Sequence, residues 1–348
     1  MRILIATDAW RPQINGVVST LERMTAAAAE FGARFEFLTP EGFPSAPTPT
    51  DPAIRLAIAS PGEIRRRIEK AAPDHIHLAT EGPIGWLARR ACLRNGVPFT
   101  TGFHTRFPEY LKARLGAPEW LGYAWLRRFH APSAAIMAPT PTIAAELTRR
   151  GFARVRLWTR GVDHRLFRPR AESVLDLPRP IFLSVGRVAV EKNLEALLKL
   201  DLPGSTVVVG DGPALKTLRA RYKRAHFLGA MQGERLASVY ASADVFVFPS
   251  RTDTFGIVLL EAMASGLPVA AFPVTGPIDV VSPGAGALRH DLRAACLEAL
   301  TIPRDAPRQH ALGFTWAESA RQFLENVGAT RRRDAVASGG EFEIVADA

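Results

Sequence analysis

The chain contains two successive series in which short apolar runs alternate with amphipathic segments. This alternation predicts parallel strands covered on both faces by helices, because parallel neighbours need a crossover connection. In the first series the expected strands are Arg2–Thr7, Phe35–Thr39, His75–Ala79, Pro98–Phe103 and Ala134–Ala138, and the expected helices are Val17–Phe31, Glu63–Ala71, Ile84–Arg94, Pro118–His130 and Thr142–Arg150.

A second series begins near Pro180, after a proline- and charge-rich stretch at residues 167–180. Two doubly wound domains joined by such a stretch leave a cleft between them, where the ligands of these sheets bind. In the first domain, the proline-rich stretch Phe43–Pro52 is expected to be a loop. The expected strands of the second series are Ile181–Val185, Thr206–Val209, Val245–Phe248 and Val269–Ala271, and the expected helices are Glu191–Leu200, Ala214–Lys223, Glu234–Ala241, Ile257–Ala264 and Asp291–Leu300.

The positive charge of the chain is confined to its first half. The net charge is +10, and residues 1–170 carry 25 Lys and Arg against 14 Asp and Glu. Residues 171–330 carry 16 of each. A basic first domain indicates an anionic partner. Nucleic acid is not expected, because no nucleic-acid-binding motif accompanies the charge.

Aromatic and basic side chains are mixed within residues 106–128, where Trp120 and Trp125 precede Arg127 and Arg128. This mixture suits an anionic lipid surface. The alternative is a solvated helix whose aromatic side chains face the core. The apolar run at the N-terminus ends at Asp8, and no stretch reaches the roughly 20 apolar residues that a membrane span needs. We therefore expect a cytoplasmic protein that contacts the inner face of the cell membrane reversibly.

The most informative motif is SRTDTFGIVLLEAMASGLP at residues 250–268, where a strand turns into a helix near Gly256. The free N–H groups and the dipole of a helix start make an anion site. Asp253 lies just before this helix and Glu261 lies inside it. Two carboxylates so spaced can hold sugar hydroxyls on either side of a bound diphosphate. The alternative is an acidic first turn followed by a solvated glutamate.

A second motif, SVGRVAVEKNL, follows the first strand of the second domain. Its Gly186 allows a tight turn, and Arg187 and Lys192 can converge on one anion. Surface Arg and Lys near a helix start are common, so this motif is weak by itself.

Three further motifs are weak individually. VVVGDGP contains Gly210, Asp211 and Gly212 but lacks dinucleotide spacing. Asn15-Gly16-Val17 starts a helix after the first strand. His104 follows the expected strand Pro98–Phe103, so we expect it to point into the cleft, although a lone histidine at a strand end is more often structural.

Taken in order, these motifs resemble the retaining GT-B glycosyltransferases of family 4 (group 1), over about residues 1–327. The resemblance is nearest to the branch of bacterial mannosyltransferases and sulfoquinovosyl-lipid synthases. It implies two Rossmann-like domains facing a central cleft. Asp253 takes the place of the family's first Glu, which contacts the donor sugar, and Glu261 takes that of the second, which contacts the ribose. Asp253 is one methylene shorter than Glu, which bears on the identity of the donor.

The resemblance also assigns roles to other residues. Arg187 and Lys192 hold the donor diphosphate, and His104 lies beside the transferred sugar. Asn15, Gly16 and Val17 approach the donor phosphates and the acceptor. The remaining donor contacts that it implies are Gly186, Gly210, Asp211, Gly212, Leu228, Gly229, Thr254, Phe255, Gly256, Ile257 and Val258.

The resemblance divides the chain into an acceptor-side domain at residues 1–170 and a nucleotide-sugar domain at 171–313. A last helix at 314–328 begins at Phe314-Thr315-Trp316 and returns to the first domain. The polar tail at 329–348 is expected to be disordered from its composition.

We therefore expect a retaining enzyme that transfers a hexose from a UDP- or GDP-sugar to an acceptor hydroxyl, without a cofactor or obligatory metal. A membrane lipid such as diacylglycerol is the first choice of acceptor, and a soluble saccharide or polysaccharide is the alternative. A sugar-nucleotide epimerase or hydrolase, or a non-catalytic partner subunit, is the competing class. The combination of Arg187 and Lys192 with Asp253 and Glu261 favours the transferase.

Overall fold

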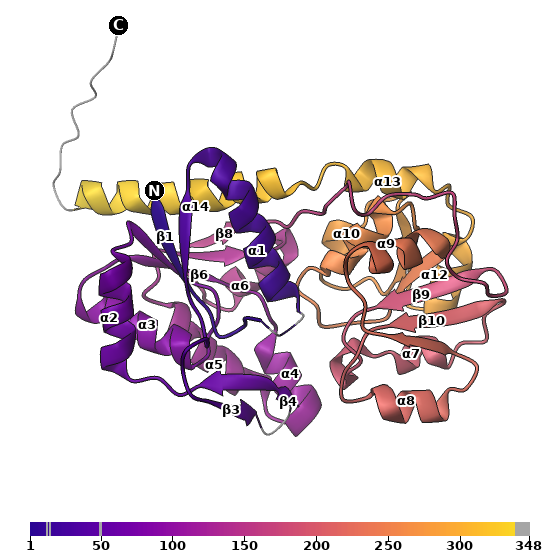
Figure 1. The fold of residues 1–348 in the computed structure, drawn as a ribbon, viewed down its shortest axis with the longest axis horizontal. Coiled ribbons are helices and arrows are strands. Elements are labelled where there is room, and N and C mark those ends of the chain that lie inside the picture. The colour runs from indigo at the N-terminus through magenta and orange to yellow at the C-terminus, as the bar shows by residue number, and fades with distance from the viewer. Residues whose placement is uncertain (12, 14, 49–50, 338–348) are drawn as a thin grey trace, which may run out of the picture.

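The computed structural model describes residues 1–11, 13, 15–48 and 51–337 and shows two α/β domains that lie side by side (Figure 1). Each domain has a six-stranded parallel sheet, with strand orders β2-β1-β5-β6-β7-β8 and β11-β10-β9-β12-β13-β14. The predicted fold class, two doubly wound Rossmann-like domains, is therefore confirmed.

The first domain is built around β1, whose residues Ile3, Leu4 and Ile5 are buried between the helical layers. Because both faces of a parallel sheet are covered, its strands are continuous apolar runs and do not alternate. The elements are β1 (Arg2–Ala6), α1 (Gly16–Ala28), the 3₁₀ helix η1 (Ala29–Phe31), β2 (Arg34–Leu38), β3 (Ser45–Thr48), β4 (Asp51–Ala57), α2 (Pro61–Ala71), β5 (His75–Leu78), α3 (Pro83–Arg94), β6 (Phe99–Gly102), α4 (Phe107–Leu115), α5 (Glu119–His130), β7 (Ala135–Ala138), α6 (Pro141–Arg149) and β8 (Val155–Leu157).

The second domain repeats the plan, with β9 and β12 at the centre of its sheet and Phe182, Phe246 and Val247 in its buried cores. Its elements are β9 (Ile181–Val185), η2 (Val190–Lys192), α7 (Glu195–Leu198), β10 (Ser205–Val209), α8 (Leu215–Arg221), β11 (His226–Gly229), α9 (Gly233–Ser242), β12 (Val245–Phe248), α10 (Ile257–Ala264), β13 (Val269–Ala271), α11 (Pro277–Val280), β14 (Gly286–Leu288), α12 (Leu292–Ala299) and α13 (Asp305–Ala311).

The chain then returns to the first domain through α14 (Trp316–Ala337), the yellow helix of Figure 1, which packs against α1. Phe323 and Val327 of α14 are buried against the first sheet. Thr330 is 2% exposed, so the helix remains packed beyond residue 328. Disorder from 329 onward is therefore wrong for residues 329–337, and residues 338–348 lie outside the described residues.

Two local expectations were also wrong. The proline-rich stretch at 43–52 is not all loop, because β3 and β4 pair there as an antiparallel hairpin. A two-stranded ribbon tolerates proline, since its outer edges need no ladder donor. The helix expected at 191–200 is broken into η2 and α7, because Asn193 adopts φ 51° and its Nδ2 donates to the Pro249 carbonyl at 3.0 Å.

Candidate active site

The candidate site lies where the second sheet changes direction. From β9 the chain proceeds to β10 on one side, and it later returns to β12 on the other. The connections that leave the carboxyl ends of two such strands run in opposite directions. The crevice that they leave outside the strand ends is where open α/β sheets bind ligands. The loops that follow β9 and β12 carry the two main sequence motifs, which contain Arg187 and Lys192 in the first loop and Asp253 in the second.

The loop after β9 is held by the glycine turn after β10. Gly186 N–H donates to the Val209 carbonyl at 3.0 Å, and Val188 N–H donates to the Asp211 carbonyl at 2.8 Å. A Cβ on Gly210 would lie 1.8 Å from the Gly186 carbonyl oxygen. The Gly-Asp-Gly turn therefore supports the segment that carries Arg187, whatever else it contacts.

Lys192 and Asp253 bring the two loops together, because the Lys192 ammonium donates to Oδ1 of the Asp253 carboxylate. Burial acts to lower the pKa of Lys192, but the Asp253 carboxylate outweighs it and the pKa is raised. Lys192 is therefore a cation. Oδ2 of Asp253 is buried and has no hydrogen-bond partner within the described part of the chain. It remains an acceptor for a ligand hydroxyl.

The start of α10 lies beside this pair. Gly256 holds the left-handed conformation, with φ 82°, and no side chain caps the N–H groups of the helix that follows. A free helix start of this kind attracts an anion. Asn15-Gly16-Val17 of the first domain lies across from it, because a Cβ on Gly16 would be 4.0 Å from Cδ1 of Ile257.

Glu261 lies inside α10, where the Tyr240 hydroxyl donates to its Oε2 at 3.0 Å. Burial raises the pKa of the Glu261 carboxyl, and the Tyr240 hydrogen bond and the charge of Arg23 oppose this rise. Tyr240 comes from α9 and was not predicted. Its sequence neighbours are small alanine, serine and valine residues, which gave no signal for this contact.

The remaining predicted donor contacts border the same crevice less closely. Leu228 and Gly229 end the edge strand β11, and the Gly229 carbonyl accepts from Gly210 N–H at 2.8 Å. Asp211 bonds the N–H of its neighbour Gly212 through Oδ1 at 2.7 Å. These residues lie at the carboxyl ends of β10 and β11.

The His104 imidazole contacts Arg160 and Trp158 of the first domain, and its predicted place beside the donor sugar stays a prediction. Arg160 donates to its Nδ1 at 3.3 Å, and its Nε2 is buried above Gly102, where an added Cβ would lie 2.5 Å away. The ring also meets Trp158 edge-on, with centroids 5.5 Å apart. The Arg160 guanidinium can only donate hydrogen bonds, so Nδ1 of His104, which it contacts, carries no proton.

The backbone carbonyl of His104 is the part that reaches the second domain. It accepts a hydrogen bond from the Thr254 hydroxyl at 2.8 Å. Burial, followed by the charge of Arg160, lowers the pKa of His104 well below its ordinary value, so the imidazole is neutral. The residue therefore connects the first domain to the loop that carries Asp253.

Arg160, which lies directly before Gly161-Val162-Asp163, is a further functional candidate. Its side chain is buried and donates to the carbonyls of Trp158 and Thr159 and to His104. Burial lowers its pKa to about 9. An arginine directly before Gly-Val-Asp was the available signal, but its contact with His104 depends on tertiary packing.

Two doubly wound domains, with a lysine and two carboxylates near a free helix start, are the arrangement of a glycosyltransferase of the GT-B fold. The model of "Glycosyltransferase Family 4" matches residues 14–166, and that of "Glycosyl transferases group 1" matches residues 179–302. The chain belongs to this family and is a hexosyltransferase that acts with nucleotide sugars.

Curated relatives agree with this assignment. A GDP-mannose-dependent alpha-mannosyltransferase of Mycobacterium tuberculosis is 30% identical over 96% of this chain and 98% of its own length. Sulfoquinovosyl transferase SQD2 of Arabidopsis thaliana is 33% identical over 69% of this chain and 50% of its own length. An alpha-monoglucosyldiacylglycerol synthase of Streptococcus pneumoniae is 27% identical over 94% and 84%. The branch expected from the motifs is thus confirmed.

Among solved structures, a sucrose-phosphate synthase from Thermosynechococcus elongatus superposes with a TM-score of 0.77. The match covers 97% of this chain and 99% of that one, at 22% sequence identity. At this identity the likeness supports the two-domain fold alone. Within the described residues, no helix is both long and apolar enough to cross a bilayer.

Proposed function

We propose that this enzyme transfers a hexose to an acceptor hydroxyl with retention of configuration, and that GDP-mannose is its donor. The observation that carries the proposal is the Lys192–Asp253 pair, which lies beside the free start of α10. The mycobacterial relative that matches almost the whole chain is named for GDP-mannose. An α-mannosyl product from the α-linked GDP-mannose means that configuration is retained.

In the proposed reaction, the bond between the anomeric carbon and the diphosphate oxygen breaks, and the acceptor oxygen bonds the anomeric carbon on the same face. The acceptor proton passes to the departing phosphate oxygen. Arg187, Lys192 and the N–H groups at the start of α10 stabilise the growing negative charge. Oriented donors of this kind contribute about 10²–10³-fold each. These groups supply the stabilisation without a metal or cofactor.

A thermal-shift screen with GDP, UDP, ADP and their sugars tests the donor. A nucleotide at 100 times its Kd stabilises the protein by about 2.7 kcal/mol. We expect GDP and GDP-mannose to raise the melting temperature most, and proton NMR of the product to show an α linkage. Stabilisation by UDP-sugars alone would reassign the donor. Donor consumption that no acceptor increases would instead indicate a hydrolase or an epimerase.

The acceptor side of the molecule presents an amphipathic surface on α5. Tyr123 and Leu126 face the core, whereas Trp120 is 67% exposed and Trp125 is 36% exposed. The helix period places Arg127 and Arg128 on the exposed side with these tryptophans. The alternative in which the aromatics all face the core is therefore not the arrangement of α5.

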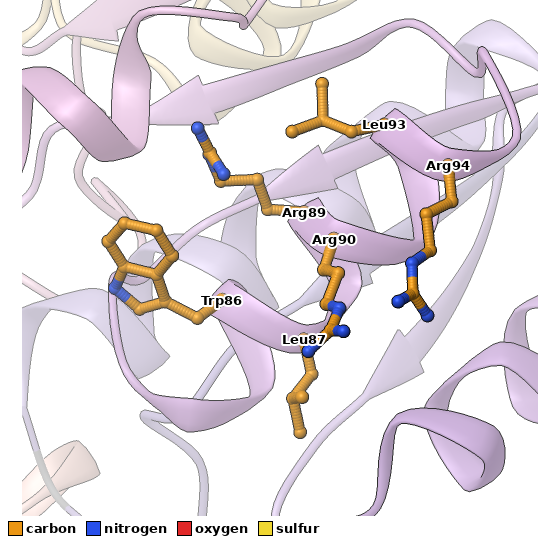
Figure 2. Close-up of a pocket in the computed structure, with 6 residues that line it drawn as sticks. All are labelled: Trp86, Leu87, Arg89, Arg90, Leu93 and Arg94. Carbon is orange, nitrogen blue, oxygen red and sulfur yellow. The ribbon is translucent and has the colours of Figure 1, made fainter.

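This surface continues onto α3. Trp125 contacts Trp86 with ring centroids 5.7 Å apart, and Trp86 lines a shallow hollow with three arginines of α3 (Figure 2). Leu93, in the same hollow, is 47% exposed. Figure 2 shows these side chains projecting from one helix. The three arginines are Arg89, Arg90 and Arg94.

We therefore also propose that α3 and α5 place the first domain on an anionic membrane, where the enzyme meets a lipid acceptor such as diacylglycerol. Residues 1–170 carry a net charge of +11, which favours this orientation. The pneumococcal relative is named as a diacylglycerol glycolipid synthase. Each Lys or Arg near an anionic surface contributes about 1 kcal/mol, so three to five suffice for reversible attachment.

Liposome sedimentation tests the membrane contact. The protein should pellet with anionic vesicles at low salt, pellet less with neutral vesicles, and be released as salt screens the attraction. Replacing both Arg127 and Arg128 with Glu should weaken pelleting and leave nucleotide binding intact. The same change at the exposed pair Lys223 and Arg224 of the second domain is the matched control. Failure to bind either vesicle type would favour a soluble saccharide acceptor.

A further inference from the structure

The first sheet has its own change of direction, between β1 and β5. The chain leaves β1 toward β2 on one side and returns to β5 on the other. The segments that follow these strands contain Asp8 and Thr80-Glu81. They are bonded to each other, because Asp8 N–H donates to Oγ1 of Thr80 at 2.6 Å and the Thr80 hydroxyl donates to Oδ2 of Asp8 at 2.9 Å. By the same rule as in the second sheet, a ligand is expected here.

The anion site at this position is already filled by the protein. Asp8 accepts from the N–H groups of Ile84 and Gly85, at 2.8 and 3.2 Å, in the first turn of α3. Gly82 allows this approach, since a Cβ there would lie 2.4 Å from Cγ of Asp8. The first domain therefore differs from the second, where the start of α10 is free. A phosphate placed here would meet a carboxylate, so a neutral ligand is favoured.

Glu81 is the polar group that remains available beside Asp8. Its Oε1 lies 3.2 Å from Nε2 of His130, which is fully buried and held at Nδ1 by the Thr101 hydroxyl at 2.8 Å. An ionised carboxylate only accepts hydrogen bonds, so His130 donates. Within the part of the chain that the structure describes, Oε2 of Glu81 has no hydrogen-bond partner and is not enclosed.

We propose that Glu81 binds a hydroxyl of the acceptor through Oε2, and that the acceptor presents a neutral polyhydroxy group at this point, either a sugar or a glycerol. His130 is a positioning residue that fixes the carboxylate. Glu81 lies in the segment after β5, and His104 lies in the loop after the neighbouring strand β6, which contacts Thr254 near Asp253. The bound hydroxyl group thus lies on the side of the cleft opposite the donor. This proposal rests on the proposed transferase function.

The test compares Glu81→Gln with the wild type in two measurements. In the first, saturation-transfer NMR in the presence of GDP reports binding of methyl α-D-mannopyranoside and glycerol. In the second, GDP release from GDP-mannose is followed with n-octyl α-D-mannopyranoside or with dioleoylglycerol vesicles. Glu69→Gln is the matched control, because Glu69 is an exposed glutamate of the first domain that pairs with Arg65.

We expect Glu81→Gln to lower kcat/KM for the acceptor by about 10–100-fold, the effect of losing a hydrogen bond to a charged group. Its NMR signal for the neutral probes should fall, while its GDP affinity by calorimetry stays that of the wild type. His130→Asn should also weaken acceptor binding, seen as a higher acceptor KM, and should keep the GDP affinity of the wild type. Glu69→Gln should behave as the wild type.

Two results would overturn the proposal. One is unchanged probe binding and acceptor kcat/KM in Glu81→Gln. The other is a wild-type protein that binds a phosphorylated polyol, such as inositol phosphate, but none of the neutral probes. Failure of the proposed function looks different, because the wild type would then bind the neutral probes and release no GDP from any donor.

Discussion

Asp253 stands where the resemblance implies a glutamate, and the structure shows what the shorter side chain contacts. One carboxylate oxygen is paired with Lys192, and the other is buried without a hydrogen bond within the described residues. A donor sugar hydroxyl would satisfy that second oxygen. Lys192 and Asp253 would then act on one ligand, the lysine on its diphosphate and the aspartate on its sugar.

Substitutions of Glu261 and Asp253 should therefore affect ligand binding in different ways. Glu261→Ala should weaken binding of the free nucleotide as well as the donor, because its expected contact is the ribose. Asp253→Ala should spare the free nucleotide and weaken only the sugar conjugate. Calorimetric titration of GDP and GDP-mannose into both variants separates the two roles. Equal loss of GDP affinity would show that the division of roles is wrong.

Asp253→Glu is the informative conservative change at this position. It supplies the residue usual in the family and extends the carboxylate by one methylene. We expect GDP affinity to be retained and the ratio of turnover between GDP-mannose and other GDP-hexoses to shift. Kinetics with two donors measure that ratio, and an unchanged ratio would remove Asp253 from donor selection.

At the scale of elements, the strands at the centres of both sheets could be predicted because they are continuous apolar runs. The short pieces could not. The hairpin of β3 and β4 is hidden by its prolines, and the break between η2 and α7 depends on a bond from Asn193 to a distant carbonyl. The local sequence pattern does not predict such tertiary contacts.

The central strand β5 also carries a buried histidine that makes stability depend on pH. Burial, with the nearby His75 and Arg160, lowers the pKa of His77 to about 3. The unfolded chain binds this proton below about pH 6.5, and the folded chain does not. The free energy of unfolding therefore has its full value, as far as His77 is concerned, above about pH 6.5. It falls by about 1.4 kcal/mol per pH unit as the pH drops from there toward 3.

Urea denaturation at pH 7 and pH 5 tests this dependence. The wild type should lose about 2 kcal/mol between these values through His77 alone. His77→Phe keeps an aromatic ring against Trp158 and Phe323 and cannot titrate, so its loss should be smaller by that amount. Equal losses in the two proteins would show that His77 is not the group responsible.

At the scale of the whole molecule, the two domains are linked at several points across the cleft. Asp279 of α11 accepts from the N–H and the hydroxyl of Thr142 at the start of α6, and Thr254 bonds the His104 carbonyl. The return of α14 to α1 adds a third link. These contacts hold the loop after β6 and the start of α6 against segments of the second domain.

The residues proposed for the donor side could be selected from the sequence, whereas those proposed for the acceptor side could not. Arg187 and Lys192 belong to one contiguous motif after β9, and Asp253 and Glu261 belong to another after β12, so local spacing was enough to select them. The acceptor-side contacts, such as Glu81 with His130, join residues from separate elements. The chain order gives no sign that those elements meet, so such contacts emerge only from the fold.

The central claim is that the donor diphosphate binds between the loops after β9 and β12. It is tested most directly by the rate of GDP release from GDP-mannose in Arg187→Ala and Lys192→Ala. The control is Lys199→Ala, an exposed lysine of the adjoining segment that pairs with Glu195. Each variant at Arg187 and Lys192 should lose about 10²-fold or more in turnover, and the control should keep its activity. Near-normal turnover in both Arg187→Ala and Lys192→Ala would contradict the account.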